Sequence, residues 1–495
     1  MALHFANGIP PRLLMWQRVR EYAVPPSMIG TATARRAVGD WAGACAAARI
    51  DVDLDLRAVR DRHGIDVVTR LRADLRRLAP DLLRWHLPRT APDGRLRPGL
   101  TLCLARYGSA RTALDLVVRT PPSWADAGQR LSLALWEGPG HDTPEPLPPP
   151  RPHPHPNPHP GVHPHPHPDR RFRLDLHRHL WDARRSGELA WRCGAEGALR
   201  SGTLPSAPSE GPLDEAATDA DSLWAVATWA AEAELLLRAE DRPRGAFTVR
   251  LGARRRAVLE LVAPDDSHAP TWRPVREALP PQEVAALPML PEAAARVLPD
   301  LELLRAGLVP ADRLHPLVAA ALAAYAPAPS AGPAPEPGDP HRVECRGEVH
   351  RIALRDGVLT AVDHDLDQLR REELLVALGG PALPCLRAID TVHRDPEALP
   401  AVRERLGHGD VVGALAVVEG LLGPSAVLRD GPLRQELESA AARRVDHGLF
   451  RAGLAPVPGA GRTNAARRQR PGRATPPYPS GKGSSRARPR TGQYR

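Results

Sequence analysis

The spacing of hydrophobic residues changes along the chain and predicts helices first and strands afterwards. From residue 32 to 87, hydrophobic residues recur every three or four positions with arginines between them, which predicts amphipathic helices. Residues 100–107 and 112–120 alternate instead between hydrophobic and polar residues, which predicts a β-hairpin. The segment 51–64, DVDLDLRAVRDRHG, fits either a strand or the start of a helix.

Further alternating segments predict a sheet that continues beyond this hairpin. Residues 130–138 (RLSLALWEG) and 170–179 (RRFRLDLHRH) each predict another strand. We expect a helix in residues 222–240 and a second hairpin in residues 245–262. Mixed periods of this kind predict an α+β protein with helices and antiparallel sheets in several domains.

Proline-rich segments divide the chain into the expected domains. The sequence holds 57 prolines, about twice the usual frequency of ~5%, and many lie in long connections. The expected order is a mainly helical region (1–95), an α+β domain with an antiparallel sheet (96–325) that contains a His/Pro-rich loop (141–168), a Pro/Ala linker (326–340), a small α+β domain (341–455) and a disordered basic tail (456–495).

The positive charge of the chain belongs to this tail. The formal net charge is +9, and residues 459–495 hold ten basic residues and no acidic one. The remainder is close to neutral, so its charge does not indicate a nucleic-acid-binding domain. Residues 459–495 are the candidate for weak contact with nucleic acid or another polyanion, and plain disorder is the alternative.

The residue types exclude several kinds of chemistry. Lys482 is the sole lysine, so residues 1–458 supply neither a Schiff-base lysine nor a phosphate-loop lysine. The five cysteines are far apart, which suits reduced thiols in a cytosol rather than disulfides or a CxxC zinc site. No segment has the pattern of a signal peptide or a membrane span, so we expect a cytoplasmic protein without membrane contact.

The stretch HPHPNPHPGVHPHPHP (153–168) combines six histidines with seven prolines and suggests either a metal site or a spacer. Alternating X-Pro bonds favour polyproline II, in which rings on one side of the helix are about 19 Å apart. Zinc ligands must lie within ~2.1 Å of one ion. We therefore interpret the stretch as a spacer, with weak zinc or nickel binding and a pH response as the alternatives.

Asp175, His177 and His179 form a sharper candidate for a metal site. On a strand, residues at i, i+2 and i+4 share one face, and two imidazoles spaced in this way can bind one metal ion. The alternative is the polar face of an amphipathic strand, on which Arg171 and Arg173 would repel a cation. A metal-dependent enzyme, with zinc or nickel, is the secondary hypothesis that follows.

A second candidate lies in the expected hairpin around Asp356-Gly357, a strong signal for a two-residue turn. The register predicted from this turn pairs Leu354 with Leu359, Ile352 with Ala361, and His350 with Asp363. A carboxylate beside an imidazole can orient a general base, so His350 and Asp363 are candidates for catalysis. The alternative is an ordinary cross-strand pair worth ~0.2–1 kcal/mol.

Other short motifs favour structural explanations. Asp51, Asp53 and Asp55 lack the glycine and glutamate of a calcium loop, which favours a solvated face or a helix cap. The glycines of GHGDVVG (407–413) follow an expected helix, so they are predicted to end one helix and begin the next rather than to bind a dinucleotide. The chain contains no GxSxG, HExxH, SxxK or Walker motif.

Two resemblances accompany these motifs. GDWAGA (39–44) and GDVVGA (409–414) each open an alanine-rich helix and resemble a helix start in a tetratricopeptide-type unit, but no repeat of about 34 residues follows. DLLRWHLPR, RRFRLDLHRHLWDARRSGEL and LPDLELLRAGL resemble stretches of conserved proteins from high-GC bacteria that carry no assigned function. This second resemblance implies no chemistry.

The absence of catalytic motifs and the long proline linkers favour a non-enzymatic protein-interaction or regulatory component, acting through protein partners. The alternatives are the metal-dependent enzyme built on Asp175, His177 and His179, and a nucleic-acid-associated protein held by its arginine-rich tail.

Overall fold

The chain divides into a unit of residues 1–455 and a second unit of residues 456–495. The computed structural model describes residues 9–108, 113–126, 129–138, 167–195, 224–253, 255–262, 269–275, 279–323, 342–345, 348–355, 358–361, 363–377, 383–386, 399–422 and 431–454. The expected basic tail, the expected linker 326–340 and residues 153–166 of the His/Pro stretch lie outside these ranges. The described part combines helices with mixed and antiparallel sheets, which confirms the α+β class.

The N-terminal region is helical, as the spacing of its hydrophobic residues predicts. Its helices are α1 (Pro11–Tyr22), α2 (Pro26–Ala37), α3 (Trp41–Ala47), α4 (Leu56–His63), α5 (Ile65–Arg77) and α6 (Pro80–His86). The segment 51–64, which fits either a strand or a helix start, contains both: strand β1 (Ile50–Asp53) is followed closely by α4. The Asp55 carboxylate accepts the backbone N–H groups of Arg57 and Ala58, so this residue is the helix cap that the sequence favours.

Strand β1 joins a four-stranded sheet with β4 (Thr101–Arg106), β5 (Asp115–Arg119) and β6 (Leu131–Trp136). The strand order is β1-β6-β5-β4. β4 pairs with β5, and β5 with β6, in antiparallel fashion, which confirms the predicted hairpin and the next strand. β1 runs parallel to β6, so the helical region contributes an edge strand to the sheet. A separate two-stranded pair consists of β2 (Arg89–Thr90) and β3 (Arg95–Leu96).

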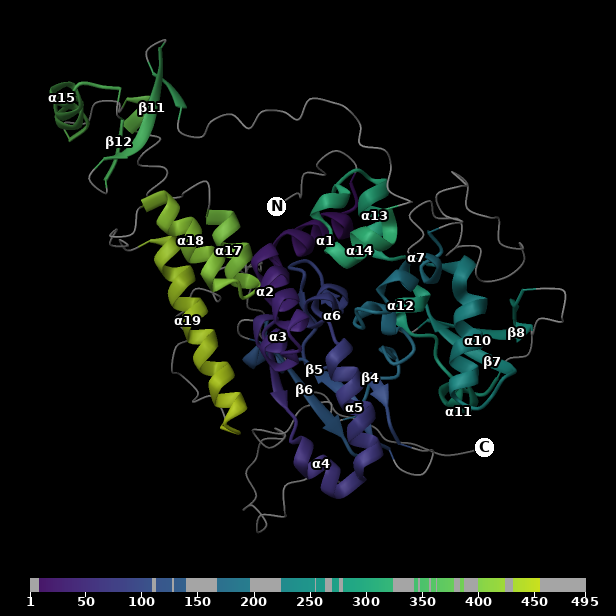
Figure 1. The fold of residues 1–495 in the computed structure, drawn as a ribbon. Coiled ribbons are helices and arrows are strands. Elements are labelled where there is room, and N and C mark those ends of the chain that lie inside the picture. Colours follow the sequence, from purple (N-terminus) through teal and green to yellow (C-terminus); the bar gives the residue numbers. More distant parts are fainter. Residues whose placement is uncertain are drawn as a thin grey trace, which may run out of the picture. The chain divides into compact units, whose positions relative to one another are not determined.

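One hydrophobic core runs through the helical region and the sheet. Leu71 of α5, Leu82 of α6 and Leu116 of β5 are fully buried in it. Helices α13 (Pro299–Arg305) and α14 (Pro316–Leu322) add further buried side chains. Figure 1 shows α5 beside β4, and this neighbourhood positions the candidate site described below.

Residues 170–179 are not a strand, so this prediction is wrong. They form consecutive turns that lead into the 3-10 helix η3 (Arg178–Leu180). Several of their backbone N–H groups donate to carbonyl groups three residues earlier, as in Leu176 to Arg173. The segment meets β4 in an isolated bridge between Arg173 and Cys103, where the Asp175 N–H donates to the Cys103 carbonyl. Local turns therefore satisfy most of the backbone groups that a strand would pair with a neighbour.

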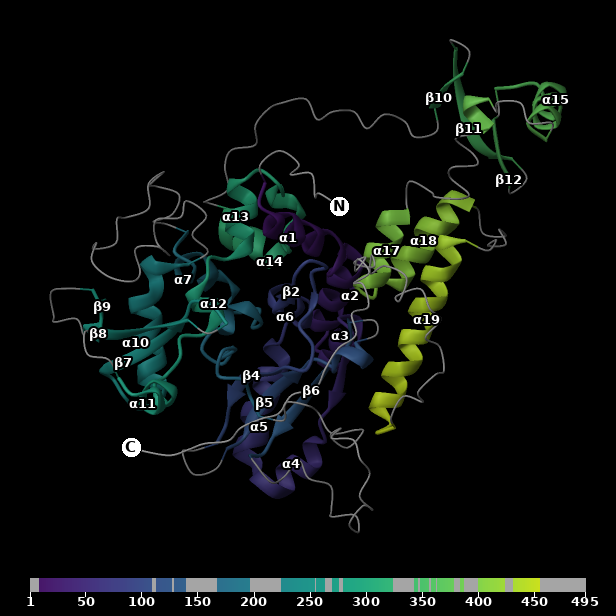
Figure 2. The ribbon, with the colours of Figure 1, turned by 180° about the vertical axis from the view of Figure 1, so that it is seen from behind.

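A second hydrophobic core surrounds α10 (Trp229–Ala239), the helix expected within residues 222–240. Strands β7 (Gly245–Arg250) and β8 (Arg256–Val262) form the predicted antiparallel hairpin, and β9 (Thr271–Pro274) extends it to three strands. Figure 2 shows α10 against this sheet. Short helices also occur in this part of the chain: α7 (Leu189–Arg192), α11 (Pro281–Ala286) and α12 (Glu292–Ala295).

Beyond the expected linker, β10 (Arg342–Cys345), β11 (Glu348–Arg355) and β12 (Val358–Ala361) form an antiparallel sheet that precedes α15 (Leu366–Ala377). The register pairs Leu354 with Leu359 and Ile352 with Ala361, which confirms two of the three predicted cross-strand pairs.

Helices α17 (Leu399–Gly407), α18 (Val411–Leu422) and α19 (Pro432–Arg451) lie side by side in Figure 1 and Figure 2. The first two confirm that the glycines of GHGDVVG separate two helices. None of the described helices combines the length and the apolar character that a membrane span requires.

The echo between GDWAGA and GDVVGA is a shared turn. Gly39 and Gly409 have φ angles of +79° and +82°, which favour glycine. Asp40 and Asp410 then accept the N–H groups of Gly43 and Gly413, respectively. An arginine five residues before each aspartate, Arg35 or Arg405, forms an ion pair with it. Both copies thus use one set of contacts to reverse the chain between two helices.

Candidate functional site

A cavity of about 510 Å³ opens where α5, β4, the 173–178 turns and the end of α10 meet. We call it the arginine pocket. It is lined by Arg70, Ala73, Asp74 and Arg77 of α5, by Ala105, Arg106 and Tyr107 at the end of β4, by Arg173, Asp175 and Arg178, and by Ala239 of α10. Its volume falls within the range of ~300–1,000 Å³ that is typical of small-molecule sites.

One face of α5 supplies the longest wall of the pocket. Positions 70, 73, 74 and 77 are spaced by three or four residues and therefore share a helical face. Val68, Leu71 and Leu75 occupy the opposite side and are buried in the first core, which holds the helix in this orientation. Arg72 and Arg76 are exposed on α5 and do not line the pocket.

Asp74 is already occupied by neighbouring donors. The Tyr107 hydroxyl donates to Asp74 Oδ2 at 2.9 Å, and Arg178 forms an ion pair with Asp74 Oδ1. Arg178 also reaches the fully buried Asp182 at 3.2 Å. Burial and the Asp74 carboxylate raise the pKa of Tyr107 well above its usual value, so its hydroxyl stays protonated and committed to Asp74.

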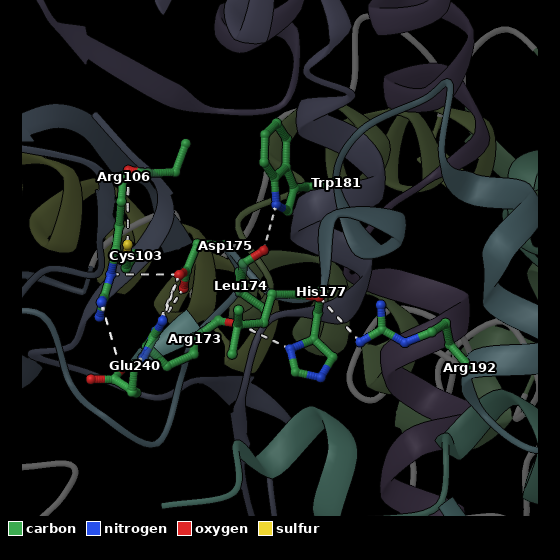
Figure 3. Close-up of polar contacts among 11 residues, drawn as sticks. Cys103, Arg106, Arg173, Leu174, Asp175, His177, Trp181, Arg192 and Glu240 are labelled. Atoms are coloured by element: carbon green, nitrogen blue, oxygen red, sulfur yellow. Dashed lines mark hydrogen bonds and ion pairs between the residues drawn. The ribbon is translucent and has the colours of Figure 1, made fainter. Parts of the chain in front are cut away.

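The opposite wall contains a second set of ion pairs (Figure 3). Arg173 Nη2 lies 2.8 Å from Asp175 Oδ2, and Arg173 Nη1 contacts Glu240 at the end of α10. The exposed Arg106 makes longer contacts of 3.5 Å with Asp175 and 3.7 Å with Glu240. Although burial opposes it, hydrogen bonding to Asp175 raises the pKa of Arg173, so this guanidinium stays charged.

Arg70 and Arg77 differ from these paired arginines. Neither has an ion-pair partner among the described residues, although carboxylates lie on the walls of the same pocket. Arg70 Nη2 donates to the Tyr107 carbonyl at 3.0 Å, and its guanidinium lies 5.7 Å from the centroid of the Tyr107 ring. The pocket thus holds two exposed guanidinium groups that a bound anion could neutralise.

The proposed metal residues point away from one another. Asp175 lies in the arginine pocket, whereas His177 lies on the other side of the segment, toward Arg192 (Figure 3). His179 is buried, its ring centroid is 5.8 Å from that of His177, and its Nδ1 has no partner. No group of three or more His, Cys, Asp or Glu side chains within the described ranges is arranged to hold a metal ion. The shared strand face on which this hypothesis depended is absent.

His177 instead belongs to a buried ionic cluster. Its Nδ1 donates to the Arg173 carbonyl at 2.9 Å, and its Nε2 is 3.1 Å from Glu232 Oε2. Arg192 Nη2 reaches the same carboxylate oxygen at 2.7 Å. Burial alone would raise the pKa of Glu232, but hydrogen bonds from His177 and Arg192 lower it to about 2. These contacts connect α10 to the 173–178 turns, which form one wall of the pocket.

The proposed general-base pair does not form. β12 ends at Ala361, and the Asp363 carboxylate turns to Arg351, accepting its backbone N–H at 2.7 Å and its side chain at 2.8 Å. His350 stacks instead on His364 with ring centroids 4.1 Å apart. The predicted third cross-strand pair is therefore wrong, because a competing guanidinium occupies Asp363.

Sequence reasoning did not identify the arginine pocket. The pattern RLRADLRR in α5 contains the pocket residues, but Arg70 and Arg77 resemble Arg72 and Arg76 in a chain in which arginine is common. The spacing of three and four residues was the available signal. Comparisons with protein-family models, with curated proteins and with solved structures give no match to this chain.

Proposed function

We propose that this protein is a cytoplasmic regulatory component that binds a small anionic ligand, most simply a phosphate ester, in the arginine pocket. The observation that carries the proposal is the pair Arg70 and Arg77, two exposed guanidinium groups in one cavity without an acidic partner among the described residues. Guanidinium groups form paired hydrogen bonds with phosphate and carboxylate oxygens.

The lining favours binding over chemical conversion. The described residues around the cavity include no histidine, cysteine or serine. Their carboxylates, Asp74 and Asp175, already accept hydrogen bonds from arginines, and Tyr107 is committed to Asp74. A ligand would therefore meet charged donors and small alanine side chains, but no free general base. In this proposal the protein acts as a regulator because it responds to whether the pocket is empty or holds the ligand.

Isothermal titration calorimetry of the full chain with butyl phosphate tests the proposal. The double variant Arg70→Gln/Arg77→Gln should weaken binding by about 10- to 100-fold, since it removes the charged hydrogen-bonding partner of the phosphate, which contributes roughly 1.5–3 kcal/mol. The matched control is Arg72→Gln/Arg76→Gln, which removes two charges from the same helix outside the pocket.

Equal weakening by both double variants would mean that the ligand responds only to the net charge of α5. Absence of binding to the unaltered chain by butyl phosphate and by every alkanediol bisphosphate at low ionic strength, where surface electrostatics are strongest, would contradict the proposal outright.

A further inference from the structure

The positions of Arg70 and Arg77 on α5 restrict the kind of anion that the pocket suits. Seven residues correspond to nearly two helical turns, so the two Cα atoms share one face and are separated by about 10 Å along the axis. Asp74 lies between them but is held by Tyr107 and Arg178. The two arginines thus start near opposite ends of the α5 wall, which suits them to serve as two separate anchors rather than as one combined site.

The described surface between the two arginines is short and contains no open aromatic face. Ala73, Ala105 and Ala239 form its apolar part. Tyr107 is the one aromatic side chain among the lining residues that the structure describes, is only 7% exposed, and has the Arg70 guanidinium near its ring. A nucleobase would therefore find no stacking platform of the kind that base-binding sites use.

We infer that the ligand carries two anionic groups on a compact frame without an aromatic base: a small bisphosphate rather than a monophosphate or a nucleotide. This inference rests on the proposed function of the pocket and specifies its ligand class. Each phosphate pairs with one of the two arginines, and the alanines accept the frame between them. Arg106, whose contacts with Asp175 and Glu240 are long, is a further donor in the lining of the pocket.

A series of α,ω-alkanediol bisphosphates with two to eight carbons probes this spacing, with butyl phosphate as the reference that carries a single phosphate group. Calorimetric affinity should pass through a maximum at an intermediate length and exceed that of butyl phosphate at least tenfold there. The single variants Arg70→Gln and Arg77→Gln should each reduce the best bisphosphate to about the affinity of butyl phosphate. Arg72→Gln should leave the length profile unchanged.

The outcomes separate the inference from the proposed function. If butyl phosphate binds as tightly as every bisphosphate, and Arg70→Gln/Arg77→Gln still abolishes binding, the two-anion inference is overturned while the pocket remains an anion site. A bisphosphate affinity that does not vary with chain length overturns it as well. If no phosphate compound in the series responds to Arg70→Gln/Arg77→Gln, both the inference and the proposed function fail.

Discussion

Arginine and carboxylate side chains contact one another in two contrasting regions of residues 1–455, the first hydrophobic core and the arginine pocket. In the first core, Arg20 donates from Nε and Nη2 to the two oxygens of Asp300, at 2.9 and 2.7 Å. Its Nη1 donates to the Trp85 carbonyl, and the Trp85 indole N–H donates to Asp300. Every nitrogen of this guanidinium has an acceptor, and both charged side chains are essentially inaccessible to water.

The arginine pocket has the same chemical groups with incomplete pairing. Its carboxylates Asp74 and Asp175 are satisfied, but Arg70 and Arg77 remain open to solvent. In a buried cluster an unpaired charge costs several kcal/mol, so each positive side chain needs a negative partner. In an open pocket, water solvates the unpaired positive charge at a small cost in free energy. On the proposed function, arginine serves stability where its pairing is complete and ligand binding where it is not.

Removal of the Asp300 carboxylate should produce the largest effect, because it leaves Arg20 buried without its counter-charge. We expect Asp300→Ala to lower the free energy of unfolding by about 3–5 kcal/mol, measured by urea denaturation with tryptophan fluorescence. The exposed pair Arg60 and Asp61 provides the control. Asp61→Ala should change stability by less than about 0.5 kcal/mol.

A double replacement tests whether the charge, rather than the packing, causes this loss. Arg20→Met/Asp300→Leu removes both charges and keeps apolar volume in the core, so it should recover much of the stability that Asp300→Ala loses. If the double variant is instead the less stable of the two, the Arg20 contacts with Trp85 and its neighbours dominate this site.

The same distinction between local pattern and tertiary pairing explains how much of the fold the sequence predicts. Alternating and β-branched residues identified β4, β5, β7 and β8 correctly, although β4 and β5 are buried on both faces. The same period of two led to the wrong prediction of a strand at residues 170–179. There, turns bury Phe172 and Leu174, and Arg173 pairs with the aspartate two residues away. A sequence pattern records burial, but it does not record which backbone groups pair.

The candidate site was beyond sequence reasoning for a related reason. Its walls come from α5, β4, the 173–178 turns and α10, which are distant in the chain and carry no short motif. Arg70 differs from Arg72 only by its tertiary surroundings, which local spacing does not reveal. By contrast, the Asp55 cap and the Gly-Asp turns at residues 39–40 and 409–410 are local features, and their sequences did indicate helix starts.

The buried Glu232 should give the next largest effect, and one that depends on pH. Because the pKa of Glu232 falls from about 4.5 to about 2 on folding, its ionised form stabilises the native state by on the order of 3 kcal/mol. This contribution is fully present above about pH 4.5 and is lost as the pH falls toward 2. Urea denaturation of Glu232→Gln should therefore show a deficit at pH 7 that shrinks below pH 4.5.

Glu234 on the same helix is the matched control for this measurement. It pairs with Arg238, whose side chain is largely exposed, so Glu234→Gln should change stability by less than about 0.5 kcal/mol at pH 7. A Glu232→Gln deficit that stays constant between pH 7 and pH 3 would show that the lost contribution is packing rather than the carboxylate charge.

The pocket arginines should have the smallest effect on the stability of the free protein. Arg70→Gln/Arg77→Gln removes no ion pair among the described residues, so the free energy of unfolding should change by less than about 1 kcal/mol, the worth of the hydrogen bond from Arg70 to Tyr107. With a bisphosphate at about 100 times its Kd, the unaltered protein should gain ~2.7 kcal/mol and the variant almost nothing. A loss of several kcal/mol without ligand would make these residues structural, like Arg20, and remove the contrast on which the ligand proposal rests.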